Sequence, residues 1–363
     1  MDDTEAFVAL NLIPRLGPVR LRGLLEAFSS PQAILSAKKE QLLAVPGVGR
    51  EVAHSITDWE GQIDLKRELK IAEEDDVSIL PLSSPEYPAL LKEIHDPPTV
   101  LYMKGTLSSG DKNAIGVVGS RKASHYALEM TKKISHQLAH HGLTVVSGLA
   151  RGVDAAAHQG ALAARGRTLG VIGSGLRRLY PPEHDKLAEL ISDSGAVLTE
   201  FPMEKKADRT TFPMRNRIIT GLSFGLLVTE AAPNSGALIS ANQAGEQGRS
   251  LYAIPGRIDL PGCIGSNRLI QQGAKLVMSA EDILDDLQIL FAKEPELASP
   301  KLPGGLSEAE RAVYEAFSDD EALVDELIAK TGLPAHTVTA TLLRLEMRLL
   351  VRQLPGGRFV QLH

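Results

Sequence analysis

Hydrophobic and polar positions change their periodicity near residue 77. In residues 1–75 apolar residues recur three or four positions apart, which is typical of amphipathic helices joined by short loops. From residue 77 onward, short apolar runs alternate with helix-length segments. The expected strands are 114–118, 144–147, 168–172, 196–199, 224–229 and 250–254, and the expected helices are 126–141, 154–165, 182–192, 214–222 and 239–247. The chain therefore begins with helices and continues with alternating strands and helices.

Several expected strands are apolar at consecutive positions, so both of their faces must be covered, as in a parallel sheet. Strand–helix alternation predicts the α/β fold class, with a doubly wound, mostly parallel sheet over residues 76–292. Ligands of such sheets bind beyond the carboxyl ends of the strands. The turns that follow the strands are therefore the expected place for a site.

The N-terminal helical pattern contains one turn with possible chemistry. Pro46-Gly47-Val48-Gly49 leads into a helix over 50–59, which is the helix-hairpin-helix pattern, and residues 1–75 are expected to form a SAM-like helical domain of this kind. The glycine turn can offer backbone N–H groups to a DNA phosphate. Since the surrounding charges are mixed, a packing domain whose glycines only make turns is an equal alternative.

The C-terminal part is expected to be a separate module. Residues 293–305 are rich in proline and glycine and predict a linker. In residues 306–363, Ser307 and Glu310 have capping-box spacing at the start of a helix. Helices over 324–331 and 336–349 and a hairpin over 351–362 then predict a winged helix. Its second helix is only mildly basic, so docking on DNA and docking on a protein are both open.

The composition restricts the kinds of site. The 363 residues have a net charge of −6, so a polyanion site must be a local basic patch on an acidic body. A lone cysteine, Cys263, excludes an intramolecular disulfide and a multi-cysteine zinc centre, and no metal is expected. No signal pattern or long apolar run is present, so we expect a cytosolic protein without a membrane segment.

Four of the expected strands end in small-residue turns, and several of these turns carry cations. They contain Gly119, Ser120, Arg121 and Lys122; Gly148 and Arg151; Gly173, Ser174 and Gly175; and Ser235 and Gly236. Backbone N–H groups at such turns, together with a helix dipole, bind anions. One glycine turn is weak support, because βα turns need glycine for backbone reasons alone. Four turns that converge on one sheet edge predict a phosphate-bearing ligand.

A fifth segment, residues 200–217, mixes cations with one aromatic residue. It contains Lys205, Lys206, Arg209, Phe212, Arg215, Asn216 and Arg217. Cations that take phosphates and a ring that stacks on a base suit single-stranded nucleic acid, where stacking contributes ~1–3 kcal/mol per base. The alternative is that Phe212 packs the following helix against the core while the arginines are solvated.

Sequence support for catalysis is weak. No G-x-G-x-x-G opens the first strand–helix unit and no Walker A sequence is present, so we expect no ATP hydrolysis and no cofactor. Asp154 and His158 are four residues apart. This spacing fits a general base with its orienting group, and it fits a helix-stabilising pair equally in geometry. Glu230 closes a strand as a possible base. No nucleophile–base–orienter set is found, and no catalytic residue is expected.

Several segments in combination resemble the DNA-processing protein A (DprA/Smf) family. They are Asp96–Tyr102, Val118–Arg121, Ser147–Asp154 with His158, Gly173–Gly175, Tyr180-Pro181, Glu200–Pro202, Phe212–Ile219, Glu230-Ala231, Ser235-Gly236, Ile254–Gly256 and Gly265–Ala274. The resemblance covers residues 77–287. The helical N-terminal region and the winged helix agree with longer members of the family.

The resemblance implies a non-catalytic protein with an extended Rossmann-like domain. Such a protein binds single-stranded DNA, forms a homodimer through that domain and loads RecA recombinase, notably in natural transformation. By similarity, Arg121 and its neighbours hold phosphate, and Phe212, Arg215 and Arg217 line the DNA path. Apolar helix segments 218–222 and 238–245 are candidate dimer surfaces or simply core. The alternatives are a phosphoribohydrolase-type enzyme with Glu230 as base, and a winged-helix transcription regulator.

Overall fold

The computed structural model describes residues 1–290, 306–317, 321–348, 350–354 and 358–361. Contacts between residues divide the chain into two compact units, Met1–Gln288 and Ile289–His363. The expected linker, residues 293–305, lies outside the described residues. In the part of the chain that the structure describes, no helix combines the length and apolar character needed to cross a membrane.

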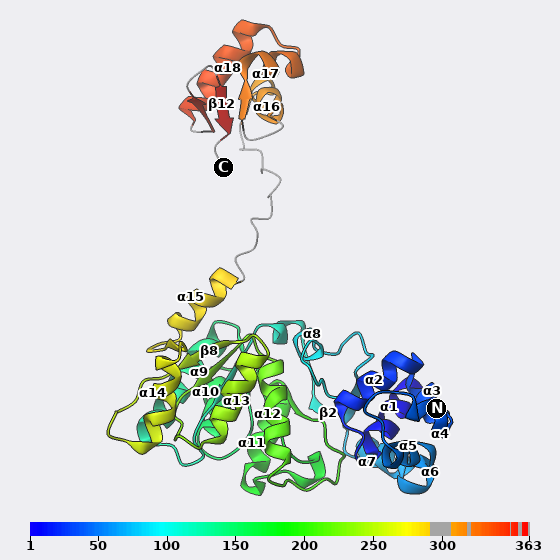
Figure 1. Cartoon of the computed structure of the whole chain (residues 1–363). Helices are drawn as coiled ribbons and strands as arrows, with labels where there is room; N and C mark the ends of the chain where they lie inside the picture. Colours follow the sequence, from blue (N-terminus) through cyan, green and yellow to red (C-terminus); the bar gives the residue numbers. More distant parts are fainter. Residues whose placement is uncertain (291–305, 318–320, 349, 355–357, 362–363) are drawn as a thin grey trace. The chain divides into compact units, whose positions relative to one another are not determined.

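The first unit is built on a nine-stranded sheet (Figure 1). The strand order is β1-β2-β6-β5-β4-β3-β7-β8-β9. The strands are β1 (Ser78–Pro81), β2 (Val100–Gly105), β3 (Ala114–Val118), β4 (Thr144–Ser147), β5 (Thr168–Val171), β6 (Ala196–Thr199), β7 (Gly225–Val228), β8 (Ser250–Ala253) and β9 (Lys275–Leu276). From β6 to β9 all neighbours are parallel, whereas β1 and β2 are antiparallel additions at one edge. The predicted mostly parallel, doubly wound sheet is confirmed.

Helices cover both faces of the sheet. Along β3, Ile115 and Val117 pack with one apolar core, and Ala114 and Val118 pack with the other, as the two-residue period of a strand requires. The first core includes α9 (His125–His140), α10 (Val153–Ala163) and α15 (Glu281–Leu290). The second includes α8 (Ala89–Lys92), α12 (Thr211–Gly221), α13 (Gly236–Glu246) and α14 (Ile264–Gln271), while α11 (Asp185–Ser194) packs on β5 and β6.

Helix α12 begins earlier than the sequence predicts. The expected start is residue 214, but the helix starts at Thr211, so Phe212 belongs to its first turn. Pro213 does not break the helix there. Backbone N–H groups in the first turn have no acceptor within the helix, so the N–H that proline lacks would form no helical hydrogen bond. Asp208 accepts hydrogen bonds from the N–H groups of Thr210 (2.7 Å) and Thr211 (3.1 Å), which secures this end of the helix.

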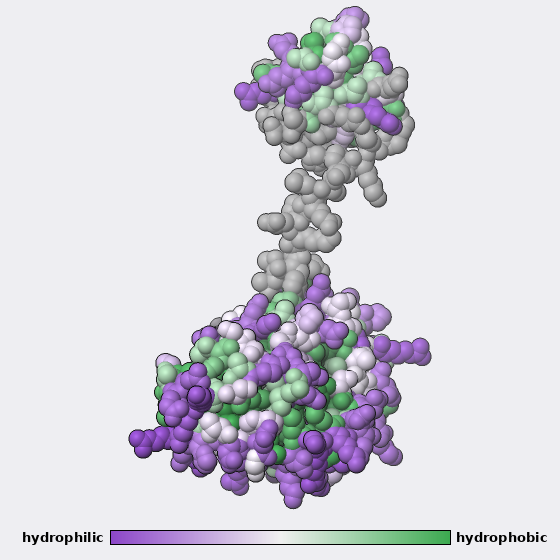
Figure 2. All heavy atoms as spheres, turned by 90° about the vertical axis from the view of Figure 1, so that its right-hand side faces the viewer, coloured by the Kyte–Doolittle hydropathy of each residue, from purple (hydrophilic) through white to green (hydrophobic). Residues whose placement is uncertain are grey.

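The N-terminal helices have a core of their own and also pack on the sheet. They are α1 (Asp3–Leu12), α2 (Pro18–Phe28), α3 (Pro31–Leu35), α4 (Lys39–Leu43), α5 (Arg50–Thr57), α6 (Trp59–Gln62) and α7 (Leu65–Glu74). A further cluster joins Phe7 and Ile71 to Val100 and Tyr102 of β2, so the helices and the sheet form one compact unit. Figure 2 faces this region and shows apolar residues gathered inside a polar outline.

The second unit has the elements of a winged helix. They are α16 (Glu308–Glu315), β10 (Glu321–Leu323), α17 (Val324–Thr331), α18 (Ala335–Met347), β11 (Val351–Leu354) and β12 (Arg358–Gln361), with strand order β10-β12-β11. The predicted capping box is present, because Ser307 and Glu310 exchange hydrogen bonds of 2.8 and 3.3 Å. On α18 the buried Thr341 faces the core, whereas Thr339 and Arg344 are exposed. The predicted winged-helix fold is confirmed.

Candidate nucleic-acid interface

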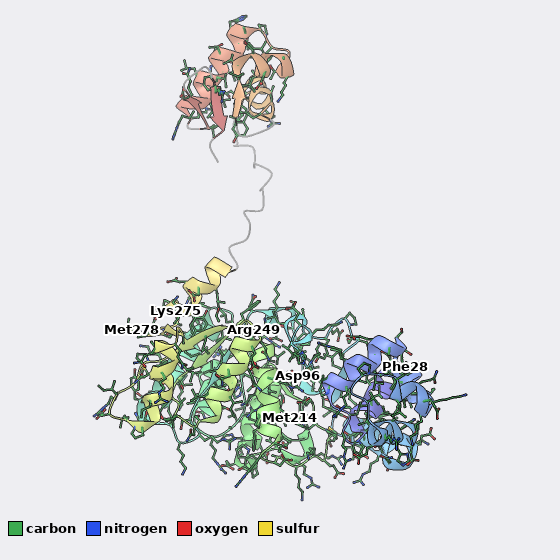
Figure 3. The ribbon with its side chains drawn as sticks, in the orientation of Figure 1. Phe28, Asp96, Met214, Arg249, Lys275 and Met278 are labelled. Carbon is green, nitrogen blue, oxygen red and sulfur yellow. The ribbon has the colours of Figure 1, made fainter. Side chains whose placement is uncertain are left out.

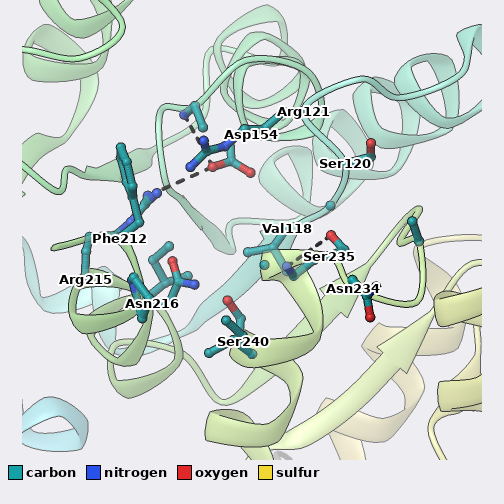
Figure 4. A pocket seen from close by; sticks show the side chains of 18 of the residues that line it. Val118, Ser120, Arg121, Asp154, Phe212, Arg215, Asn216, Asn234, Ser235 and Ser240 are labelled. Carbon is teal, nitrogen blue, oxygen red and sulfur yellow. Dashed lines mark hydrogen bonds and ion pairs between the residues drawn. The ribbon is translucent and has the colours of Figure 1, made fainter. Parts of the chain in front are cut away.

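One hollow of the first unit lies beside two neighbouring strands whose following helices cover opposite faces of the sheet. Strands β3 and β7 are parallel neighbours, but the helices that follow them, α9 and α13, cover opposite faces. A crevice opens between two such turns, and α/β proteins bind their ligands there. Here it forms a pocket of about 610 Å³ (Figure 4).

The pocket brings together a large part of the predicted site. Three segments meet there: the turn after β3, the beginning of α12 and the N-terminus of α13. The predicted residues that line it are Gly119, Ser120, Arg121, Lys122, Arg209, Phe212, Arg215, Asn216, Ser235 and Gly236. Figure 4 shows Arg121, Phe212 and Arg215 on one side and Asn234, Ser235 and Ser240 on the other.

The turn after β3 is held mainly by its own backbone. Ser120 donates its N–H to the Glu230 carbonyl (2.8 Å), and the N–H of Lys122 donates to the Ser120 hydroxyl (3.1 Å). A Cβ atom at Gly119 would come within 2.6 Å of the Val153 side chain, so glycine is required by packing. Two N–H groups of this turn are therefore used within the protein, so the expectation that the turn offers backbone N–H groups to a phosphate does not extend to these two.

The cations at the mouth of the pocket are available to a ligand. Arg121, Lys122 and Arg209 are exposed, and they form no ion pair with any residue that the structure describes. The guanidinium carbon of Arg121 lies 4.6 Å from the centre of the Phe212 ring. This cation–π contact contributes ~0.5–1 kcal/mol at an exposed site and orients the guanidinium over the ring.

A second aromatic ring, which the sequence analysis did not assign to the site, adjoins Phe212. The centroids of Tyr180 and Phe212 are 5.9 Å apart with an angle of 52° between the ring planes, and Tyr180 is 43% exposed. A Cβ atom at Gly173 would come within 3.1 Å of the Phe212 ring, so this predicted glycine gives room to the aromatic pair. The sequence Tyr180-Pro181-Pro182 after the third glycine turn was the signal that could have identified this ring as part of the site.

The N-terminus of α13 forms the opposite wall. Ser235 is its N-cap and accepts a hydrogen bond from the N–H of Ala237 (3.3 Å). The space beside Gly236 is open, with nothing within 4 Å of where a Cβ atom would be. An uncovered helix N-terminus next to three exposed cations is a favourable place for an anion.

Arg215 lines the pocket but is almost completely buried. Its Nη1 donates to the Val171 carbonyl (2.8 Å) and lies 4.0 Å from a carboxylate oxygen of Asp154. Burial lowers the pKa of Arg215 to about 10, so the guanidinium stays charged at neutral pH, and burial raises the pKa of Asp154. A side chain at Gly148 would overlap Arg215. Gly148 and Arg215 therefore support the pocket wall from within.

Arg217 lies away from the pocket, contrary to its predicted place on the same path. Only 5% of its side chain is exposed; it forms a buried ion pair with Glu200, and its Nε lies 3.1 Å from Asp96. Residues two positions apart lie on nearly opposite sides of a helix, which is why Arg215 and Arg217 diverge. Arg217 instead borders a separate polar hollow of about 390 Å³.

The remaining predicted residues also lie outside the pocket. Ser174 is fully buried, and the N–H of Gly175 donates to the Lys205 carbonyl (2.8 Å). The Lys205 ammonium lies 3.3 Å from Asp208, and Arg151 pairs with Glu183 at 2.5 Å. The Ser174 side chain is thus enclosed and the other groups have internal partners, so their role as direct phosphate ligands stays a prediction.

The candidate acid–base residues have structural partners. Glu230 accepts hydrogen bonds from the N–H (3.1 Å) and hydroxyl (2.5 Å) of Ser124, the N-cap of α9. The spacing of Asp154 and His158 suggested that they form a pair, but they do not. The Nδ1 of His158 bonds to the Thr168 hydroxyl (2.7 Å), and burial lowers the pKa of His158 to about 3.

Among the described residues, no group of three or more His, Cys, Asp or Glu side chains could hold a metal ion. His136 and His140 stack at helical spacing on α9, with ring centroids 6.3 Å apart, but they are a pair only. The lining of the pocket offers cations and the Phe212 ring to a ligand.

The fold and the pocket define a doubly wound α/β protein with a cationic, aromatic crevice at the switch point of its sheet. The family described as DNA recombination-mediator protein A matches residues 78–288, and the chain belongs to this family, DprA/Smf. The DprA winged helix domain matches residues 297–357, and a SAM-like helix-hairpin-helix tandem matches residues 7–58.

Relatives agree along most of the chain. Protein Smf of Synechocystis sp. (strain PCC 6803) is 33% identical over 387 residues, which cover 97% of both chains. DNA processing protein DprA of Bacillus subtilis is 43% identical over 61% of this chain and 75% of its own. The crystal structure of DprA from Streptococcus pneumoniae matches with a TM-score of 0.70 and 33% identity, over 79% of this chain and 99% of that one.

A second structure concerns DNA processing protein A from Helicobacter pylori and the way in which that protein binds single-stranded DNA. It matches with a TM-score of 0.52 and 26% identity, over 59% of this chain and 96% of that one.

Proposed function

We propose that this protein binds single-stranded DNA in the pocket at the sheet edge and passes the strand to RecA recombinase, without altering it chemically. The observation that carries the proposal is a crevice with unpaired cations, lined by the part-buried Phe212 ring, with the exposed Tyr180 ring beside it. The single-stranded DNA binding of the H. pylori relative supports it.

Each wall of the pocket has a part in binding. Arg121, Lys122 and Arg209 take backbone phosphates, and the N-terminus of α13 offers its dipole to another. Phe212 and Tyr180 stack on bases, which is tolerant of sequence because every base has a π face. We therefore expect binding with strong salt dependence and little sequence preference.

The absence of an enzymatic activity is part of the proposal. A phosphoribohydrolase-type reaction would need Glu230 as a base, but its carboxylate accepts hydrogen bonds from Ser124 and is 4% exposed. His158 is fully buried and uncharged at neutral pH. These placements support a binding protein over a nucleotide enzyme.

We also propose a homodimer and a cytoplasmic place of action, where RecA and chromosomal DNA are found. Residues 218–222 contribute buried side chains, so core packing explains that candidate surface. Strand β9 ends the sheet, and Leu276 in it and Met278 just after it are exposed; Figure 3 shows Met278 far from Phe28 of the helical region. An apolar sheet edge of this kind suits a second copy of the chain. Light scattering after gel filtration measures the oligomeric state.

The proposal is tested by salt-titrated binding of the full chain to single-stranded DNA, duplex DNA and a mononucleotide. We expect preference for the single strand. Arg121→Ala should weaken binding uniformly across sequences and flatten the log–log salt slope by about 0.7 for one lost phosphate contact. Lys133→Ala, which removes an exposed cation of α9 that does not line the pocket, is the control and should leave the slope unchanged.

Equal slopes for wild type and Arg121→Ala would overturn the proposed site. Preference for the mononucleotide, with product release, would favour the enzyme. Loading of RecA is measured separately, as the rate at which RecA assembles on single-stranded DNA that is already coated with this protein.

A further inference from the structure

Helix α7 of the N-terminal region contacts the loop that carries Tyr180. At the end of α7, Asp75 accepts hydrogen bonds from Arg177 Nε (2.5 Å) and Nη2 (2.9 Å), and Glu74 accepts one from the same Nη2 (3.0 Å). The guanidinium lowers the pKa of Asp75 and so favours the ionised, hydrogen-bonded form at neutral pH. Arg177 is only three residues before Tyr180 in the sequence.

The same helix holds the segment that leads into Phe212. Glu68 of α7 is buried and accepts a hydrogen bond from the N–H of Met203 (2.8 Å). Arg67 of α7 pairs with Glu204 at 2.6 Å, and Glu204 also lies 3.5 Å from Arg178. Helix α7 therefore contacts both segments, at residues 177–178 and at residues 203–204.

Backbone hydrogen bonds join these two segments to each other. The N–H of Arg177 donates to the Met203 carbonyl (3.1 Å), and the N–H of Gly175 donates to the Lys205 carbonyl (2.8 Å). A displacement of one segment is therefore transmitted to the other. Tyr180 follows the first segment and Phe212 follows the second, and their rings adjoin beside the pocket that Phe212 lines.

We propose that α7 is a positioning element of the pocket, in which Asp75 and Glu74 act through Arg177 to set Tyr180 against Phe212. The inference rests on the proposed function and assigns the N-terminal helical region a part in DNA binding that requires no DNA contact of its own. Two carboxylates close to a polyanion path oppose binding electrostatically. Any favourable contribution of Asp75 and Glu74 to DNA binding must therefore come from the way they position the two rings.

The direction in which Asp75→Asn changes DNA affinity separates a positioning role from a long-range effect of charge. Asp75→Asn removes the charge that holds Arg177, and Glu73→Gln removes a charge from an exposed neighbour on the same helix. If only long-range charge matters, both variants bind single-stranded DNA more tightly. The positioning role predicts that Asp75→Asn weakens binding of the full chain roughly fivefold, the loss of one modest stacking contact, with an unchanged salt slope. Glu73→Gln should not weaken it.

A double variant shows whether the effect passes through Tyr180. In a Tyr180→Ala background, Asp75→Asn should cause no further loss, because the contact that it positions is already gone. An equal loss in both backgrounds overturns the proposal. Tighter binding and a steeper salt slope in Asp75→Asn also overturn it, since Arg177 would then be a phosphate ligand that Asp75 withholds.

A measurement without DNA keeps this inference separate from the proposed function. Amide hydrogen exchange in residues 174–182 should be faster in Asp75→Asn than in wild type or Glu73→Gln, because the loop loses its contact with α7. Unchanged exchange contradicts the positioning role even where DNA binds as proposed. Failure of the proposed function appears instead in wild type and Arg121→Ala, as binding with no dependence on the pocket cations.

Discussion

Two groups of arginines in the same unit have opposite surroundings. At the mouth of the pocket, Arg121 and Arg209 are exposed and form no ion pair with the residues that the structure describes. Within α12, Arg215 and Arg217 are 4% and 5% exposed and face the carboxylates of Asp154 and Glu200. The first pair can neutralise a ligand, whereas the charge of the second pair is used inside the protein. Residue type alone therefore does not identify a phosphate ligand, although burial and partners do.

The largest expected effect comes from the interior group. Arg217→Ala should lower the free energy of unfolding by about 3–5 kcal/mol, because it leaves Glu200 buried without its partner. Arg209→Ala, at an exposed position eight residues away, should change it by less than about 0.5 kcal/mol. Urea unfolding of the two variants measures both. Similar midpoints would remove the distinction between the two groups.

The next effect belongs to the mouth of the pocket. Phe212→Ala should reduce the free energy of single-stranded DNA binding by about 1–3 kcal/mol while leaving the salt slope unchanged, since a ring stacks on bases and contacts no phosphate. Tyr126→Ala removes an exposed ring outside the pocket and serves as the control. A flattened slope in Phe212→Ala would mean that the ring mainly holds Arg121 in place.

A further effect depends on pH and concerns the buried His158. The pKa of His158 is about 3 in the folded protein and ~6.5 when unfolded, so the unfolded chain binds more protons between these values. The free energy of unfolding should therefore fall as pH drops below about 6.5, by up to ~1.4 kcal/mol per pH unit from this residue.

His158→Gln should flatten that dependence between pH 7 and 5, and the exposed His125→Gln should not. Urea unfolding at several pH values provides the comparison. Parallel curves for wild type and His158→Gln would mean that His158 takes up its proton in the folded state.

The central strands could be predicted because burial on both faces leaves a continuous apolar run in the sequence. The edge strands could not: β9 has only two residues, and the antiparallel pairing of β1 and β2 depends on partners distant in sequence. Convergence of the turns after β3 and β7 followed from the parallel sheet, which is why Arg121 and Ser235 were predicted to meet.

Side-chain partners were beyond the reach of sequence patterns. Arg209 and Arg217 stand in the same cationic segment, and only the fold shows that Glu200 takes the second. Tyr180 was missed as a site residue because its nearness to Phe212 depends on two loops that meet across 32 residues of chain. The winged helix was predicted from spacing and capping, which are local, so its fold could be assigned from sequence.

The apolar contact between the N-terminal helices and β2 restricts how the family can vary in length. Val100 and Tyr102 are fully buried where they pack with Phe7 and Ile71. A member that lost these helices would present both side chains to water on the face of the sheet, where exposed apolar surface promotes aggregation. Loss of the helical region and polar replacement at these two positions should therefore occur together in evolution.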